Sequence, residues 1–175
     1  MRRCVGALVV ISGSLLVATL AVHASDAELG LPKELASYGS WPHLLKRPRP
    51  VSEQLWDLCR APTLDEQKAL AEAAIEHLVM VYATPSAAQA MSGKSASMPV
   101  GSILAKEKHS GVFASPPEGV AFMLKHSDDA FRNTGDWEFR YYPPSGDPVA
   151  THQHCAACHR LGQSRDYVLG SYPSQ

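Results

Sequence analysis

The chain has 175 residues, 45% of them hydrophobic, and a formal net charge of −1 at pH 7. This length favours a single domain. Because the charges nearly balance and no basic stripe runs along the chain, the sequence argues against nucleic acid as a partner.

The first 24 residues have the pattern of a secretory signal peptide. Arg2 and Arg3 precede a long apolar run, which ends with small residues at Val22 and Ala24 before a polar segment begins. This order predicts cleavage after Ala24 and export to the periplasm. The apolar run is also nearly long enough to span a bilayer, so a retained membrane anchor is the alternative.

Removal of the signal peptide takes Cys4 with it and leaves Cys59, Cys155 and Cys158. An odd number of cysteines in an exported protein argues against a disulfide framework. Cys59 lies at helical spacing from Leu55, which predicts a buried apolar side chain rather than a reactive one.

The mature chain is predicted to consist of an N-terminal segment followed by a folded domain. Residues 25–50 are polar and rich in proline, and they predict an extended N-terminal segment ahead of a folded domain at 51–175, with a short packed piece expected at LASYGSWPHLL, residues 35–45. Two helices are expected at the start of that domain. The first covers 52–59, and the second begins at a capping box formed by Thr63 and Glu66.

Short apolar or alternating segments, separated by turn residues, make up most of the remaining domain. A brief helix is expected to start with Pro85 in its first turn and to stop at Gly93. The predicted strands are 77–83, 102–109, 119–126 and 136–142. Helices followed by strands that are joined by turns predict an α+β fold, with an antiparallel sheet and short flanking helices.

The segment HQHCAACHR, residues 152–160, is the chemically richest part of the chain. A structural zinc site usually has two separated ligand pairs, and here no second cysteine pair exists. A redox dithiol needs a CxxC at the start of a helix after a strand, and it does not require a histidine at the next position. A c-type haem site needs two thiols and an adjacent histidine, which Cys155, Cys158 and His159 supply in that order.

The sequence therefore predicts a covalent haem c near the C-terminus, with Cys155 and Cys158 in thioether bonds and His159 as the axial ligand of the iron. Haem attachment of this kind takes place outside the cytoplasm, in agreement with the signal peptide. His152 and His154 are expected to be solvated loop histidines or groups near a haem propionate.

Function then depends on the opposite coordination position of the iron. A histidine or methionine at that position gives a low-spin electron carrier, whereas an open position binds small molecules. Met123 is the candidate for an internal ligand.

Four blocks of the sequence, VYATPSAAQAM, PVGSILAKEKH, GDWEFRYYPPSG and CAACHRLGQSRDYVL, together resemble the cytochrome P-460 family, which includes the cytochromes c′-beta. The resemblance runs from about Trp41 to Tyr172. It implies an antiparallel β domain with flanking helices, a homodimer, and a five-coordinate c-type haem with an open distal pocket.

Within that family, the cytochromes P-460 oxidise hydroxylamine and carry a lysine bonded to the porphyrin edge, and Lys106 occupies the matching position. Alternation along strand 102–109 places Lys106 on the same side as Leu104. The family's distal carboxylate has no match on the next strand, where the corresponding stretch holds Ala121, Phe122 and Met123, and Glu107 and Glu118 are the other candidate carboxylates. An apolar lid over the iron, with Phe122 as the candidate, is closer to the cytochromes c′-beta, which bind NO and CO.

The resulting hypothesis is an exported mono-haem c-type cytochrome with an open distal site that binds or oxidises small nitrogen compounds such as hydroxylamine or NO. Under it the protein is a candidate hydroxylamine or NO oxidoreductase that forms a homodimer and passes electrons to a soluble redox partner. A module that binds NO or CO without catalysis and a low-spin electron-transfer cytochrome are the alternatives.

Overall fold

The computed structural model describes residues 29–51, 77–93, 97–110, 117–127, 129–144 and 152–170. The expected signal peptide at residues 1–24, the two helices expected between 52 and 76, and Cys59 lie outside these residues. Among the helices of the described ranges, none has the length and apolar character required to cross a membrane.

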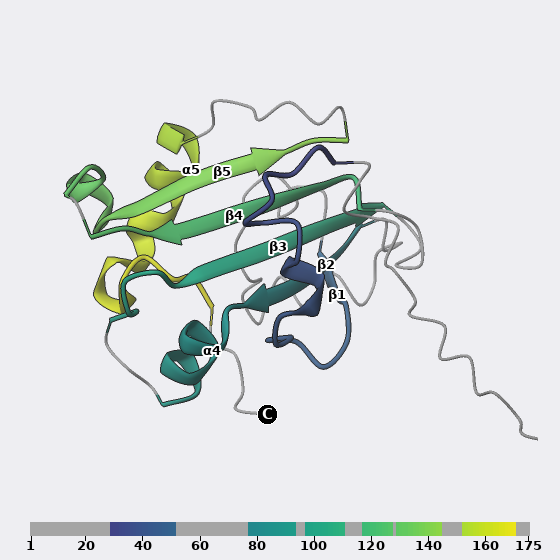
Figure 1. Ribbon diagram of the computed structural model, residues 1–175, viewed down its shortest axis with the longest axis horizontal. Helices are drawn as coiled ribbons and strands as arrows, with labels where there is room; N and C mark the ends of the chain where they lie inside the picture. Colours follow the sequence, from purple (N-terminus) through teal and green to yellow (C-terminus); the bar gives the residue numbers. More distant parts are fainter. Residues whose placement is uncertain are drawn as a thin grey trace, which may run out of the picture.

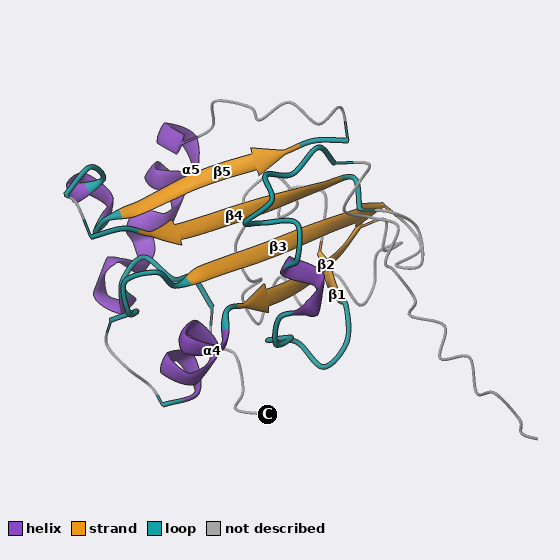
Figure 2. Ribbon diagram, viewed as in Figure 1, coloured by secondary structure: helices purple, strands orange, loops and turns teal. Residues whose placement is uncertain are grey.

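A five-stranded antiparallel sheet forms the centre of the molecule (Figure 1 and Figure 2). Its strands are β1 (Arg49–Val51), β2 (His77–Ala83), β3 (Ile103–Ser110), β4 (Gly119–Lys125) and β5 (Trp137–Tyr142). Each strand pairs with the next one along the chain, in the order β1-β2-β3-β4-β5. This arrangement confirms the predicted α+β class.

Short helices flank the sheet. They are η1 (Tyr38–Ser40), α4 (Pro85–Ser92), η2 (Arg132–Thr134), α5 (His152–His159) and η3 (Arg160–Arg165). Pro85 opens α4, where its missing N–H costs no hydrogen bond, and the helix ends just before Gly93 as predicted. The cysteine motif lies on α5 and runs directly into η3.

Because side chains alternate along a strand, the register divides the sheet into two faces. We call the first the pocket face, which carries Lys106, Ala121 and Tyr141 on directly paired positions of β3, β4 and β5. We call the second the core face, which carries Ala105 and Phe122 on the neighbouring paired positions. Figure 1 shows the N-terminal segment, in purple, crossing one side of the sheet while α5 lies on the other.

The N-terminal segment contains the packed piece expected at residues 35–45, and it also supplies a strand that the sequence did not predict. Leu35 and Tyr38 are fully buried against the core face, and the segment bonds to the edge of β2 through a bridge between His43 and Tyr82. Its last residues form β1, which pairs with β2. The proline within β1 is tolerated because β1 is short and pairs with β2 alone among the described strands.

Candidate functional site

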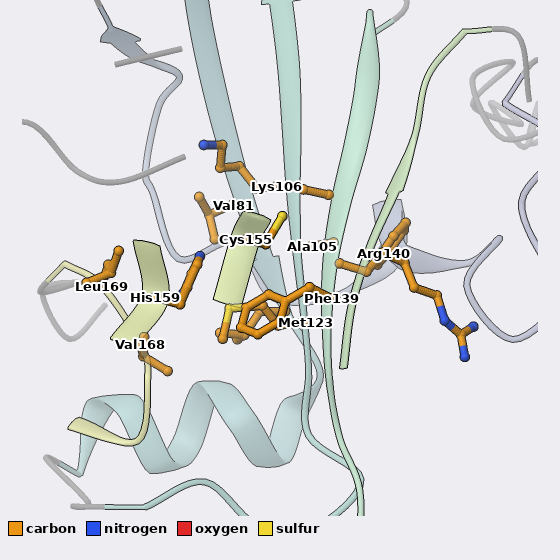
Figure 3. Close-up of a pocket in the computed structure, with 13 residues that line it drawn as sticks. Val81, Ala105, Lys106, Met123, Phe139, Arg140, Cys155, His159, Val168 and Leu169 are labelled. Carbon is orange, nitrogen blue, oxygen red and sulfur yellow. The ribbon is translucent and has the colours of Figure 1, made fainter. Parts of the chain in front are cut away.

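A pocket lies between the sheet and the C-terminal helices (Figure 3). Its empty space measures about 550 Å³ when the open mouth is included. The residues that line it come from β2 to β5, α5 and the segment after η3: Val81, Leu104, Ala105, Lys106, Ala121, Phe122, Met123, Phe139, Arg140, Cys155, His159, Val168 and Leu169. Apolar side chains predominate, so the pocket suits a large apolar group.

Helix α5 brings the predicted ligands to this pocket. Cys155 and His159 are four residues apart, so one turn of helix places both on the same side, and both line the pocket. Cys158 is three residues after Cys155 and is also half-buried. The two thiols and the imidazole thus belong to one short rigid element, which can present all three to the same bound group.

His159 is held in one tautomer and one orientation. Its Nδ1 lies 2.8 Å from the carbonyl oxygen of Tyr167, an acceptor, so Nδ1 carries the proton and donates. Its ring lies 4.8 Å from the ring of Phe139, centroid to centroid. This arrangement leaves the lone pair of Nε2 for a metal ion, as is usual for histidine ligands.

Electrostatics also favour a neutral His159. Burial lowers the pKa of the imidazole, the hydrogen bond to Tyr167 acts in the opposite direction, and the positive charge of Lys106 lowers the pKa further. The net shift is downward, so the ring is neutral near pH 7. A neutral imidazole is the form that binds iron.

Lys106 lies where the sequence places it. It lines the pocket from the middle strand β3, between Val81 on β2 and Ala121 on β4. Figure 3 shows its side chain on the same side of the sheet as α5. The predicted alternation with Leu104 holds, since both residues line the pocket.

Phe122 borders the pocket, but its ring is part of the core face. The ring is 1% exposed and packs edge-on against Tyr38 and Tyr142, at centroid distances of 5.5 and 5.8 Å. Its strand neighbours Ala121 and Met123 alternate to the pocket face instead. Those two residues, with Phe139 from β5, supply the apolar surface that the sequence assigned to Phe122.

His152 has a defined structural role that its sequence context did not predict. The backbone N–H of Phe139 donates a hydrogen bond to its Nδ1, at 3.2 Å. Its ring lies between Phe131 and Phe139, at centroid distances of 5.0 and 5.6 Å. His152 is thus an anchor between α5 and β5, whereas His154 is exposed as expected.

The residues of the site fit a covalently held haem better than a zinc site or a redox dithiol, the two alternatives considered from the sequence. Zinc would need several converging ligands, and the described ranges contain no group of three or more His, Cys, Asp or Glu side chains able to hold a metal ion. A dithiol does not require the oriented imidazole of His159. A haem uses both thiols, the imidazole and the apolar wall of the pocket.

Comparison with known proteins agrees with this donor set. The family model described as Cytochrome P460 matches residues 54–169, which is more than half of the chain and spans the pocket strands and the cysteine motif. No curated protein is significantly similar to the chain. The match over most of the folded domain shows that the chain belongs to the cytochrome P-460 family, whose members are haem cytochromes.

Proposed function

We propose that the chain is an exported mono-haem c-type cytochrome whose haem keeps one axial side open to small nitrogen compounds such as hydroxylamine or NO. The observation that carries this proposal is the position of Cys155, Cys158 and His159 on one helix, α5, from which Cys155 and His159 line an apolar pocket. When bound there, the haem supplies a redox-active iron with a coordination position for a small ligand.

Each residue of the site has a distinct task in this proposal. Cys155 and Cys158 hold the porphyrin through thioether bonds. His159 binds the iron through Nε2, while its Nδ1–H stays bonded to the Tyr167 carbonyl. Lys106 contacts the porphyrin edge, as in the hydroxylamine-oxidising members of the family, and the apolar pocket wall keeps water away from the bound group.

Gas binding without catalysis is the second candidate, and the composition of the pocket favours it. None of the described residues that line the pocket is acidic, so no carboxylate there can take a proton from hydroxylamine. Ala121 and Met123 offer an apolar surface, which admits neutral diatomic molecules more readily than ions. Met123 also keeps open the third candidate, an electron carrier with a methionine ligand.

Mass spectrometry tests the attachment. Protein produced in a host that attaches haem c should keep one haem on the denatured polypeptide, and the double variant Cys155→Ala, Cys158→Ala should lose it. Comparison of Lys106→Met with the unaltered protein then shows whether a further bond to the porphyrin exists. Unmodified sulfur atoms at both cysteines in the unaltered protein would overturn the proposal.

Absorption spectra separate the three functions. A ferrous protein that binds CO and NO has an open site, and oxidation of hydroxylamine with an added electron acceptor then distinguishes the enzyme from the gas-binding module. A six-coordinate spectrum that CO leaves unchanged, and that becomes CO-sensitive in Met123→Leu, identifies the electron carrier.

The cellular setting belongs to the same proposal. Export through residues 1–24, a homodimer and a soluble redox partner are expected from the sequence and its family resemblance. Fractionation of expressing cells tests the periplasmic location, and analytical ultracentrifugation of the haem-loaded protein tests the dimer.

A further inference from the structure

Asp166, just after η3, joins three separate parts of the chain to the haem-motif segment. Lys125 at the end of β4 donates from Nζ to both carboxylate oxygens, at 2.7 and 2.9 Å. The backbone N–H of Met98 donates to Oδ2 at 2.7 Å, and Nε1 of Trp137 donates to the backbone carbonyl of Asp166 at 2.8 Å. We call these four residues the Asp166 clamp.

The clamp is well shielded from water. The side chains of Lys125 and Asp166 are only 12% and 10% exposed, and Trp137 is fully buried. The Lys125 ammonium also lies 5.2 Å from the ring centroid of Trp137, where a cation–π attraction adds to the ion pair. Solvent screening is therefore weaker here than at a surface ion pair, and the geometry is held by several bonds at once.

The clamp acts on the residue that orients His159. Asp166 and the next residue, Tyr167, both have left-handed backbone conformations, with φ of 52° and 64°. Residues other than glycine are strained in this conformation and persist in it only where the surroundings hold them. The clamp thus holds the residue directly before Tyr167, whose carbonyl accepts the Nδ1–H bond of His159 and whose own N–H donates to the carbonyl of Gly162 at 2.9 Å.

We propose that Asp166 is a positioning residue that sets the orientation and donor strength of His159 through the Tyr167 carbonyl. The inference rests on the proposed function, because it takes His159 as the axial ligand of the iron. A firm Nδ1–H···O bond makes the imidazole a stronger donor, and a stronger donor stabilises ferric iron over ferrous iron. Loosening the clamp weakens that bond and shifts the balance towards the ferrous form.

Two variants test this from opposite sides of the ion pair. Asp166→Asn keeps the size of the side chain, an acceptor oxygen for Met98 and a residue type that tolerates a left-handed backbone, but it loses the charge. Lys125→Met keeps the apolar stem and leaves Asp166 in place. Asp129→Asn is the matched control, since Asp129 also has a positive φ of 59° but pairs with Arg132 on the exposed surface.

The measurements are made on the haem-loaded protein: haem mass, reduction potential, and the iron–histidine stretching frequency of the ferrous form by resonance Raman spectroscopy. In both clamp variants the haem should stay attached. The ferric-to-ferrous ratio at a fixed solution potential should fall about tenfold, which is about 59 mV for one electron, and the stretching frequency should decrease. The control should match the unaltered protein.

Each other outcome has a definite meaning. Clamp variants that melt at lower temperature but keep the unaltered potential and stretching frequency overturn the inference and leave Asp166 a purely structural role. Equal shifts in Asp129→Asn also overturn it. If Asp166→Asn does not fold, Lys125→Met decides alone. Absence of haem from the unaltered protein counts against the proposed function itself, which these variants do not probe.

Discussion

At the scale of single residues, two histidines on α5 illustrate how position within one turn decides a side chain's role. His152 accepts a hydrogen bond from the backbone of Phe139 and packs between two phenyl rings. His154, two residues further, points to solvent because a helix turns by more than half a revolution over that distance. The first fixes the helix that carries the haem motif, and the second does not.

We expect His152→Ala to lower the free energy of unfolding by about 1–3 kcal/mol, because the N–H of Phe139 loses its acceptor and two ring contacts disappear. His154→Ala is the control and should change that free energy by no more than about 0.5 kcal/mol. Urea unfolding of the haem-loaded protein, followed by circular dichroism, measures both. Equal effects of the two substitutions would show that His152 does not anchor α5.

Single-residue chemistry also decided how much of the site could be predicted. Cys155, Cys158 and His159 are adjacent in sequence, so their spacing alone indicates haem attachment. Phe139 reaches the site only through pairing of distant segments. Asp166 lies close to His159 in the sequence, but nothing around it indicates that Lys125 and Met98 bind it. Phe139 alternates with Trp137 and Tyr141 on the pocket face, which was a signal for its side but not for its contact with His159.

At the scale of elements, the strands were predictable and some of their neighbours were not. β2 and α4 agree closely with the sequence, and β3 to β5 agree within about a residue, because alternation and turn residues act locally. β1 was missed since Pro50 is a poor strand former, tolerated only because the strand is short and pairs on one side. The helix under the haem motif has polar and apolar residues mixed on its faces, so periodicity did not reveal it.

The ends of β4 and β5 are joined by a partly exposed charge cluster. Glu138 accepts bonds from Arg140 at 2.6 and 2.8 Å and lies 2.9 Å from Nε2 of His126. Burial raises the pKa of the Glu138 carboxyl, but the hydrogen bonds and charges of Arg140 and His126 outweigh that effect and lower it overall. The ionised form is therefore favoured more in the folded chain than in the unfolded one.

A lowered carboxyl pKa contributes stability above its unfolded value of 4.5, and this contribution is lost as the pH falls through the folded pKa. At pH 7 we expect Glu138→Gln to be less stable than the unaltered protein by at most about 1 kcal/mol, since the cluster is partly solvated. Thermal unfolding at pH 7 and at several values below 4.5 should show this difference shrinking towards zero. A difference independent of pH would contradict the assignment.

At the scale of the whole molecule, the sheet separates two functions. Its pocket face supports α5 and the candidate haem site, while its core face buries the N-terminal segment, which packs Tyr38 against Phe122 and Tyr82 (Figure 1). The strand β3 takes part in both, because Lys106 lines the pocket and the next residue, Glu107, turns to the core. Packing of the N-terminal segment on the core face can therefore affect the backbone of β3, which also carries Lys106 on the pocket face.

Glu107 is the polar centre of the core face. Its carboxylate accepts hydrogen bonds from the hydroxyl groups of Tyr38, at 2.8 Å, and Tyr82, at 2.9 Å, and lies 3.1 Å from Nε2 of His109. Tyr38 belongs to the N-terminal segment and the other two to the sheet, so the carboxylate links these parts of the fold. Buried hydrogen bonds to a charged group contribute about 1.5–3 kcal/mol each.

Glu107→Gln replaces one acceptor oxygen by an NH₂ group that faces the same donors. We expect it to lower the free energy of unfolding by about 2 kcal/mol and to loosen the N-terminal segment from the sheet. Hydrogen exchange should then increase for the amide of Leu44, which bonds the segment to Val81 of β2, and for the amide of Tyr38, which bonds to Leu35 within the segment. Glu118→Gln, at an exposed position next to β4, is the control and should leave both quantities unchanged. If exchange rises equally across all strands while the N-terminal amides do not stand out, Glu107 stabilises the sheet as a whole rather than the attachment of this segment.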